Sequence, residues 1–433
     1  MKIGIDARTI FSPQPRGTGR NLFDAYRLIP ALRPDWTFHL YHQRPAAACP
    51  LVCGAAEADR PEESAWPANV ALRRIDIPGD RLNLWFQLRL PVAAWRDRLD
   101  LLHLPANAAP AWCPVPTVVT VHDLVPLKIA DELPPPARER FRRGVLRAAR
   151  TARHIITPSA TTRDELCGEF GVCADRVTVI PWAADRLIAG MSDATSSSAF
   201  HAVRRRYQLH RPWMLNFSGP TRRKNAAGLL AGFAQLPAEI RAVCDLVLVG
   251  CATSEFQAEL AAMAQTLGIS EHCRFLAFVP HADLPYLLGG ARALLMPSLA
   301  EGFGLPILDA FACGVPVLTS ACSSMPEVAG DTALYCDPVS PASIAAGMLQ
   351  ILQRQVATAL VARGRQRVQQ FTWEATATAM CQVYERCLLD TGRLQAPYPL
   401  PAGRDERGHA TQAAGAGTAG RRTATVARGV ACH

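Results

Sequence analysis

The chain has no uninterrupted apolar run of about 18 residues, the length that a membrane-spanning helix needs. It begins MKIGIDARTI, a strand pattern followed by polar residues and not the pattern of a secretory signal peptide. Its 14 cysteines lack the paired spacing of a zinc site or a disulfide framework, which fits a reducing cytosol. We therefore expect a cytoplasmic protein without a membrane span and without a structural metal.

Two other patterns are missing. No two aspartates are spaced D-x-D, so no such carboxylate pair is available to hold a divalent cation. The arginines are not interleaved with stacking aromatic residues, which argues against a nucleic-acid partner. The net charge of +9 nevertheless favours an acidic partner, either an anionic lipid or the phosphates of a nucleotide.

Short apolar runs alternate with longer helical patterns, which predicts an α/β fold built on parallel sheets. The chain divides at a small, polar stretch that contains Thr-Ser-Ser-Ser. The predicted parts are one α/β half at residues 1–185, a linker at 186–199, a second α/β half at 200–370, a last helix region at 371–392 and a disordered tail at 393–433. Strands are predicted at residues 2–5, 38–41, 101–104, 117–121, 154–157, 177–180, 213–217, 246–249, 273–276, 293–296 and 316–319.

The most informative segment is SLAEGFGLPILDAFACGVPVL, at residues 298–318. Its acid Glu301 precedes a glycine-flanked turn, and a short helix carrying Asp309 follows. The N–H groups of the first helical turn have no partners within the helix, so they suit an anionic diphosphate. Carboxylates on either side can accept hydrogen bonds from sugar hydroxyls, so the segment predicts a nucleotide-sugar site; a plain strand–turn–helix connection stays open. The residues of this predicted cradle are Glu301, Gly302, Phe303, Gly304, Leu305 and Asp309.

Three further segments carry candidate groups. Gly17 and Gly19 follow the first strand and are expected to form a phosphate loop before a helix at 21–32, although Leu22 breaks the dinucleotide-binding pattern. His122 ends an apolar strand, where its imidazole could hydrogen-bond a hydroxyl or a developing charge. Arg222, Arg223 and Lys224 precede a helix and could clamp a diphosphate leaving group. A tight turn, a histidine satisfied by backbone and an exposed basic loop are the respective alternatives.

Residues 138–153 form a predicted helix with seven arginines, one glutamate and an apolar stripe. Such a helix can lie on an anionic membrane surface. It can equally be an outer helix whose stripe packs into the core, and the sequence alone leaves both open.

Taken together, these segments resemble glycosyltransferase family 4, the retaining enzymes of the GT-B architecture. The resemblance covers about 380 residues and rests on motifs in a fixed order. They are IGIDAR, VHDLVP, IITPSATTRDEL with VTVIPWAAD, SGPTRRKN, EGFGLPILDAFACGVPVL and PEVAGDTALYCDP.

The resemblance implies two Rossmann-like domains facing across a cleft, with the last helix crossing back to the first domain. It assigns Glu301 to the donor sugar, Arg223 and Lys224 to the diphosphate, and His122 to the neighbourhood of the reacting carbon. The backbone of residues 303–305 would support the diphosphate, and Gly17 and Gly19 would line the phosphate and acceptor side.

Two departures from the family pattern stand out. Asp309 occupies the position of a glutamate expected to bind the nucleotide ribose, and it is shorter by one methylene. Ser218 lies where some relatives carry another phosphate-binding arginine, for which Arg222 could substitute.

The resemblance leads us to expect a metal-independent, retaining hexosyltransferase without a cofactor, acting in polysaccharide biosynthesis. GDP-mannose is the favoured donor and UDP-glucose its rival. We expect the acceptor to be a lipid-linked saccharide, reached at the cytoplasmic face of the inner membrane through peripheral contact with anionic lipid. A non-catalytic GT-B-shaped subunit that binds nucleotide or glycan is the alternative.

Overall fold

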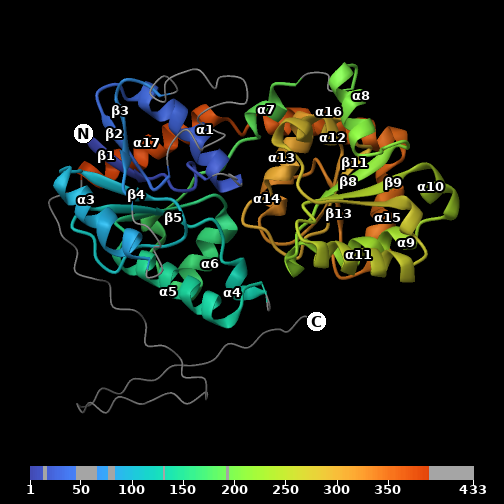
Figure 1. The fold of residues 1–433 in the computed structure, drawn as a ribbon, viewed down its shortest axis with the longest axis horizontal. Coiled ribbons are helices and arrows are strands. Elements are labelled where there is room, and N and C mark those ends of the chain that lie inside the picture. The colour runs from blue at the N-terminus through green and yellow to red at the C-terminus, as the bar shows by residue number, and fades with distance from the viewer. Residues whose placement is uncertain (13–16, 45–65, 77–82, 130–131, 192–194, 390–433) are drawn as a thin grey trace, which may run out of the picture. The chain divides into compact units, whose positions relative to one another are not determined.

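A computed structural model describes residues 1–12, 17–44, 66–76, 83–129, 132–191 and 195–389. The described residues contain two sheets whose strands all run parallel (Figure 1). We call the part from β1 to β7 the first half and the part from β8 to β13 the second half. The predicted tail at 393–433 lies outside the described residues, and the predicted domain boundaries stay predictions.

The first sheet has seven strands in the order β3-β2-β1-β4-β5-β6-β7. These strands are β1 (Lys2–Asp6), β2 (Thr37–His42), β3 (Val70–Arg74), β4 (Leu101–Leu104), β5 (Thr117–Thr120), β6 (His154–Thr157) and β7 (Val177–Val179). The α-helices of this half are α1 (Gly17–Leu32), α3 (Leu90–Arg96), α4 (Val125–Lys128), α5 (Pro135–Thr151) and α6 (Ala160–Phe170). The short helix α7 (Arg186–Ala189) lies on the connection to the second half.

The second sheet has six strands in the order β10-β9-β8-β11-β12-β13. They are β8 (Trp213–Phe217), β9 (Asp245–Val249), β10 (Cys273–Leu276), β11 (Ala293–Met296), β12 (Val317–Ser320) and β13 (Leu334–Cys336). The helices that follow α7 are α8 (Ser198–Arg206), α9 (Ala226–Ala234), α10 (Ala238–Val243), α11 (Ser254–Thr266), α12 (Leu284–Gly289), α13 (Leu305–Ala312), α14 (Met325–Ala329), α15 (Pro341–Ile351), α16 (Arg354–Val368) and α17 (Trp373–Leu389).

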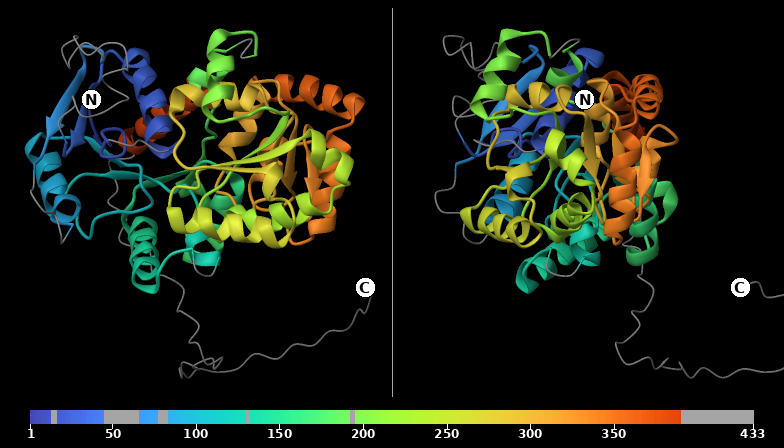
Figure 2. Two further views of the ribbon diagram at one scale, coloured as in Figure 1. Left: turned by 45° about the vertical axis from the view of Figure 1, so that its right-hand side comes forward. Right: turned by 90° about the vertical axis from the view of Figure 1, so that its right-hand side faces the viewer.

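Both sheets are covered by helices on their two faces, which explains their continuous apolar strands (Figures 1 and 2). The side chains of the central strands β4, β5, β11 and β12 are buried throughout. In both sheets the order reverses beside the first strand of the half. Ligand-binding groups gather outside the carboxyl ends of the strands at such reversals.

The last helix, α17, returns to the first half, as expected. Figure 1 shows α17 beside α1 on one face of the first sheet. Buried hydroxyls fasten it there: Tyr384 Oη lies 2.6 Å from Tyr26 Oη of α1 and 2.9 Å from His103 Nδ1 of β4. Burial lowers the pKa of His103 to about 3, so this ring stays neutral.

The predicted strands are confirmed with small shifts of their ends, but two strands were missed. β3 and β13 lie at the sheet edges, and β3 ends in two arginines. The helix predicted at 21–32 begins at Gly17. The prediction of a loop at Gly17 and Gly19 is therefore wrong, because both glycines belong to the first turns of α1.

The basic helix α5 packs its apolar stripe into the core of the first half. Gly144, Val145, Ala148 and Ala149 are buried on it, whereas several of its arginines are exposed. The structure thus confirms the alternative in which this helix is an outer helix whose apolar stripe packs into the core.

Among the described residues, no single helix is long and apolar enough to cross a membrane. Only a pair bent by 88°, Pro341–Ile351 with Arg354–Leu389, passes on length and composition.

Candidate functional site

The turn between β11 and α13 has the predicted geometry. Gly304 has φ 114°, a left-handed conformation that favours glycine, and it precedes the first residue of α13. Pro306 stands in the first turn, where its missing N–H costs no hydrogen bond, and Gly314 follows the helix with φ 68°. The N-terminus of α13 is therefore built from the residues that the sequence suggested.

Glu301 is the centre of a cluster of charged side chains. Its side chain is only 9% exposed, and its two oxygens accept hydrogen bonds from three groups. Arg223 Nη1 donates at 2.5 Å, Lys224 Nζ at 2.7 Å and Ser298 Oγ at 2.9 Å. The structure thus brings the predicted acid into direct contact with two of the three predicted cations.

The protonation of Glu301 follows from this contact. Burial disfavours its charged form, but the neighbouring Lys224 and Arg223 outweigh burial and hold the pKa of Glu301 below its ordinary value. The cluster is consequently made of ionised partners at neutral pH.

Two serines hold the turn that carries Glu301. The hydroxyls of Ser323 and Ser324 donate to the carbonyl of Glu301 at 2.6 and 2.8 Å, and Ser324 also donates to the carbonyl of Phe303 at 2.9 Å. These serines follow β12, so neighbouring strand ends cooperate in shaping the turn. Sequence reasoning did not single them out.

The loop that carries the cations is also fixed in place. Asn225 adopts a left-handed conformation, and its side-chain amide donates to the carbonyls of Pro297 and Pro338 at 2.9 and 2.7 Å. The adjacent Arg222 is exposed, and its side chain forms no hydrogen bond or ion pair with the residues that the structure describes. Its predicted contact with phosphate stays a prediction.

His122 follows β5 and is held at both its backbone and its ring. Its N–H donates to Asn107 Oδ1 at 2.6 Å, and its ring Nε2 lies 2.7 Å from the carbonyl of Pro105. A carbonyl only accepts, so Nε2 carries the proton, and Nδ1 of the neutral ring remains an acceptor. Burial lowers the pKa of His122 and so favours the neutral ring, and it outweighs the hydrogen bond to Pro105, which raises the pKa.

Gly302 joins the segment of His122 to that of Glu301. A Cβ at Gly302 would lie 2.5 Å from the carbonyl oxygen of His122 and 2.7 Å from Asp123 Cβ. Ser159, at the start of α6, donates to the carbonyl of Gly302 at 2.9 Å. Close approach of the two halves therefore requires a glycine at this position.

Of the two glycines of α1, Gly19 serves close approach and Gly17 makes an ordinary contact. A Cβ at Gly19 would lie 2.3 Å from the carbonyl oxygen of Thr9, and one at Gly17 would lie 3.8 Å from Leu305 Cδ1 of α13. Gly17 is thus near the N-terminus of α13, although it belongs to a helix and not to a loop.

Asp309 faces the segment that connects the halves. Its Oδ1 accepts the backbone N–H of Asp185 at 2.9 Å, and the Asp185 carboxylate lies 2.7 Å from His281 Nε2. Burial raises the pKa of Asp309 to about 7, although the hydrogen bond from Asp185 opposes the rise. Its predicted contact with a ribose stays a prediction.

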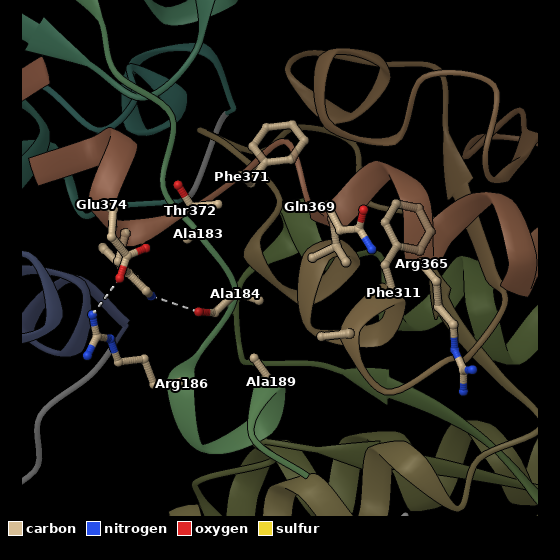
Figure 3. Close-up of a pocket in the computed structure, with 13 residues that line it drawn as sticks. Ala183, Ala184, Arg186, Ala189, Phe311, Arg365, Gln369, Phe371, Thr372 and Glu374 are labelled. Carbon is tan, nitrogen blue, oxygen red and sulfur yellow. Dashed lines mark hydrogen bonds and ion pairs between the residues drawn. The ribbon is translucent and has the colours of Figure 1, made fainter. Parts of the chain in front are cut away.

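A separate cavity of about 540 Å³ lies where the chain passes between the halves (Figure 3). Figure 3 shows Ala183, Ala184 and Arg186 on one connection and Thr372 and Glu374 on the other. Trp373 Nε1 donates to the carbonyl of Ala184 at 2.8 Å, and Arg186 pairs with Glu374 at 3.6 Å. None of the predicted site residues lines this cavity.

Sequence reasoning also missed two carboxylates that bridge the halves. Glu132 Oε1 accepts from Arg223 Nε at 2.9 Å. Glu327 accepts from the backbone N–H groups of Ala160 and Thr161, at 2.6 and 2.7 Å, and so caps α6 from the second half. Glu327 lies within PEVAGDTALYCDP, the last of the motifs noted in the sequence, which was its only signal.

Two family descriptions match the chain. "Glycosyl transferases group 1" matches residues 208–367, and "Glycosyltransferase Family 4" matches residues 50–186. The matches fall on the second and the first half, respectively.

Similar proteins include two that are named mannosyltransferases. The chain is 35% identical over 277 residues to the O-antigen chain mannosyltransferase B of Escherichia coli, covering 62% of this chain and 70% of that protein. It is 30% identical over 229 residues to the serotype-specific mannosyltransferase WbdA of Escherichia coli, of which the match spans 27%.

Solved structures share the fold at low sequence identity. Anabaena Alr3699/HepE, in a complex with UDP and glucose, gives a TM-score of 0.64 at 19% identity, covering 89% of this chain and 100% of that one. WaaG, a glycosyltransferase of lipopolysaccharide biosynthesis, gives 0.65 at 15% identity, covering 89% and 99%. The architecture is GT-B, and the chain belongs to glycosyltransferase family 4.

Proposed function

We propose that this glycosyltransferase moves a hexosyl group, with mannosyl favoured, from a nucleoside-diphosphate sugar to a hydroxyl of a saccharide. One observation carries the proposal: Glu301, Arg223 and Lys224 meet beside the N-terminus of α13, and Gly302 brings His122 to the same place. This grouping combines acceptors for sugar hydroxyls with cations for a diphosphate.

The proposed roles follow from the chemistry of each group. Arg223 and Lys224 stabilise the charge that develops on the departing diphosphate. Glu301 orients the donor sugar, and neutral His122 can accept a hydroxyl hydrogen bond at Nδ1. The bond from the anomeric carbon to the diphosphate oxygen breaks as the bond to the acceptor oxygen forms on the same face. The proton of the acceptor hydroxyl passes to the diphosphate, and the anomeric configuration is retained.

The identity of the donor and acceptor, the location and the independence of a metal are further proposals. GDP-mannose is the favoured donor because the matched relatives are named mannosyltransferases, and UDP-glucose is its rival because a structural neighbour holds UDP with glucose. We propose a lipid-linked acceptor, a cytoplasmic location and electrostatic contact of α5 with anionic lipid. We also propose catalysis without a divalent metal, so turnover should persist in a chelator.

Substitution of Lys224 tests the site. Lys224→Ala should lower turnover by about two to three orders of magnitude, because it removes one charge-stabilising donor. The measurement is diphosphate release and product formation with GDP-mannose and UDP-glucose. Arg354→Ala, which removes an exposed cation of α16, is the matched control and should keep normal turnover. Near-normal turnover of a folded Lys224→Ala protein would contradict the assignment.

A non-catalytic binding subunit is the second candidate. It is favoured by the contact of Asp309 with the Asp185 backbone, because this contact engages the acid that was expected to bind the ribose. Such a subunit would bind a sugar nucleotide without releasing its diphosphate. Slow hydrolysis of a bound donor in the absence of acceptor would exclude it.

A further inference from the structure

Arg223 is shared by two carboxylates that come from different halves. Its Nε donates to Glu132 Oε1 at 2.9 Å, and its Nη1 donates to Glu301 Oε2 at 2.5 Å. Glu132 belongs to the segment between α4 and α5 of the first half. The guanidinium assigned to the diphosphate is therefore already occupied by a carboxylate from across the interface.

The two carboxylates are held unequally. Both oxygens of Glu301 are engaged, by Arg223, Lys224 and Ser298, and serine hydroxyls fix its backbone. Among the described residues, the side chain of Glu132 is held by Arg223 alone, and its other oxygen, Oε2, is buried without a hydrogen-bond partner there. Because its side chain is only 8% exposed, Glu132 gives up hydration without a full set of hydrogen bonds in return.

The charges of the cluster already balance. Arg223 and Lys224 carry two positive charges, and Glu132 and Glu301 carry two negative charges. Asp123 is close enough to interact with both Arg223 and Glu301. A doubly charged diphosphate that approached these four groups would meet no excess positive charge from them, and it would be repelled by Glu132.

We propose that Glu132 occupies the place on Arg223 that the donor's diphosphate takes when it binds. The diphosphate must therefore displace Glu132 from Arg223. Glu301 stays in place because it is anchored, whereas Glu132 leaves because its position is poorly compensated. The inference rests on the proposed function, since it assumes that Arg223 binds the diphosphate.

This exchange makes Glu132 a determinant of donor affinity. A diphosphate, with more negative charge than a carboxylate, gains by taking Arg223, but it must first displace Glu132. Glu132 therefore lowers the affinity for every anion that binds Arg223.

Binding of nucleotides tests the inference without requiring turnover. Isothermal titration with GDP, UDP and GMP is performed on the full chain and on Glu132→Gln, which keeps the side-chain shape and removes the charge. We expect Glu132→Gln to bind GDP and UDP about tenfold more tightly, a gain of about 1.4 kcal/mol, and the gain for GMP, which carries less charge, to be no larger. Glu139→Gln, a half-exposed glutamate of α5, is the control and should bind like the unmodified protein.

A second variant tests whether Arg223 mediates the effect. In an Arg223→Ala background, Glu132→Gln should bring no gain in affinity, because the guanidinium for which the anions compete is gone. Unchanged or weaker diphosphate binding by folded Glu132→Gln would overturn the inference and leave the proposed function standing. Absence of GDP and UDP binding by the folded unmodified chain would overturn both.

Discussion

Gly302 shows how much depends on one missing methyl group. The carbonyl of His122 and the Cβ of Asp123 lie where a side chain would begin. Both neighbours belong to the other half, so any side chain at position 302 must separate the segment of Glu301 from that of His122. The site and the interface therefore share the same requirement for glycine.

Gly302→Ala should consequently reduce both stability and turnover. We expect overpacking to cost about 1–3 kcal/mol, seen as a lower melting temperature, together with a loss of transferase activity. Gly168→Ala is the control, because a Cβ at this exposed position of α6 meets nothing within 4 Å. It should leave activity unchanged and slightly raise stability. Equal activity of both variants would contradict the close approach.

Asp309 links protonation to stability. Burial raises its pKa to about 7, whereas an unperturbed aspartate has a pKa of about 3.9. Between these values the unfolded chain ionises and the folded chain does not. The stability associated with the raised pKa is therefore present at low pH and lost as the pH rises through about 7.

Asp309→Asn should remove this dependence and keep an acceptor for the N–H of Asp185. We compare the melting temperature of the variant with that of the unmodified protein at each pH. We expect this difference to be about 2–4 °C larger at pH 8 than at pH 5, the shift that about 1 kcal/mol produces. Asp331→Asn, at an exposed position, is the matched control. The same difference in melting temperature at both pH values would refute the prediction.

At the scale of elements, local pattern predicted what is locally determined. β4, β6 and β8 begin and end at the predicted residues, because apolar runs end there in polar or turn residues. β3 was missed because its hydrogen bonds come from β2, and its own sequence, VALRR, has little strand character. α1 starts early, and its first turns include Gly19, which packs against Thr9 in the loop after β1.

The candidate site divides in the same way. Glu301, Arg223, Lys224 and the start of α13 could be predicted, because each lies in a short motif beside a strand end. Glu132 and Glu327 could not be, since their partners are 91 and about 166 residues away and are brought near only by the meeting of two halves. Asp309 was predicted as a ligand-binding acid, but its contact with Asp185 depends on the path of the connecting segment.

At the scale of the whole molecule, α17 is part of the core of the first half. Tyr384 reaches both Tyr26 of α1 and His103 of β4, and these side chains are fully buried. His103 Nε2 lies 2.8 Å from Thr120 Oγ1 of β5, so the network extends across the sheet. The end of the described chain thus stabilises its beginning.

Tyr384→Phe should destabilise the protein without changing its fold. Loss of one buried hydroxyl that serves two partners should cost about 1–3 kcal/mol, measured as a lower denaturant midpoint with an unchanged slope. Tyr335→Phe, which removes a partly exposed hydroxyl, is the control and should have a smaller effect. Equal midpoints for both variants would show that the network contributes no stability.

The return of α17 also has a consequence for synthesis on the ribosome. The face of α1 that carries Tyr26 packs against α17, which is translated only after the whole second half. The first half therefore cannot complete its interior as it emerges, and it remains open on that face until the final helix arrives. The first half can thus complete its folding only after α17 has been synthesised.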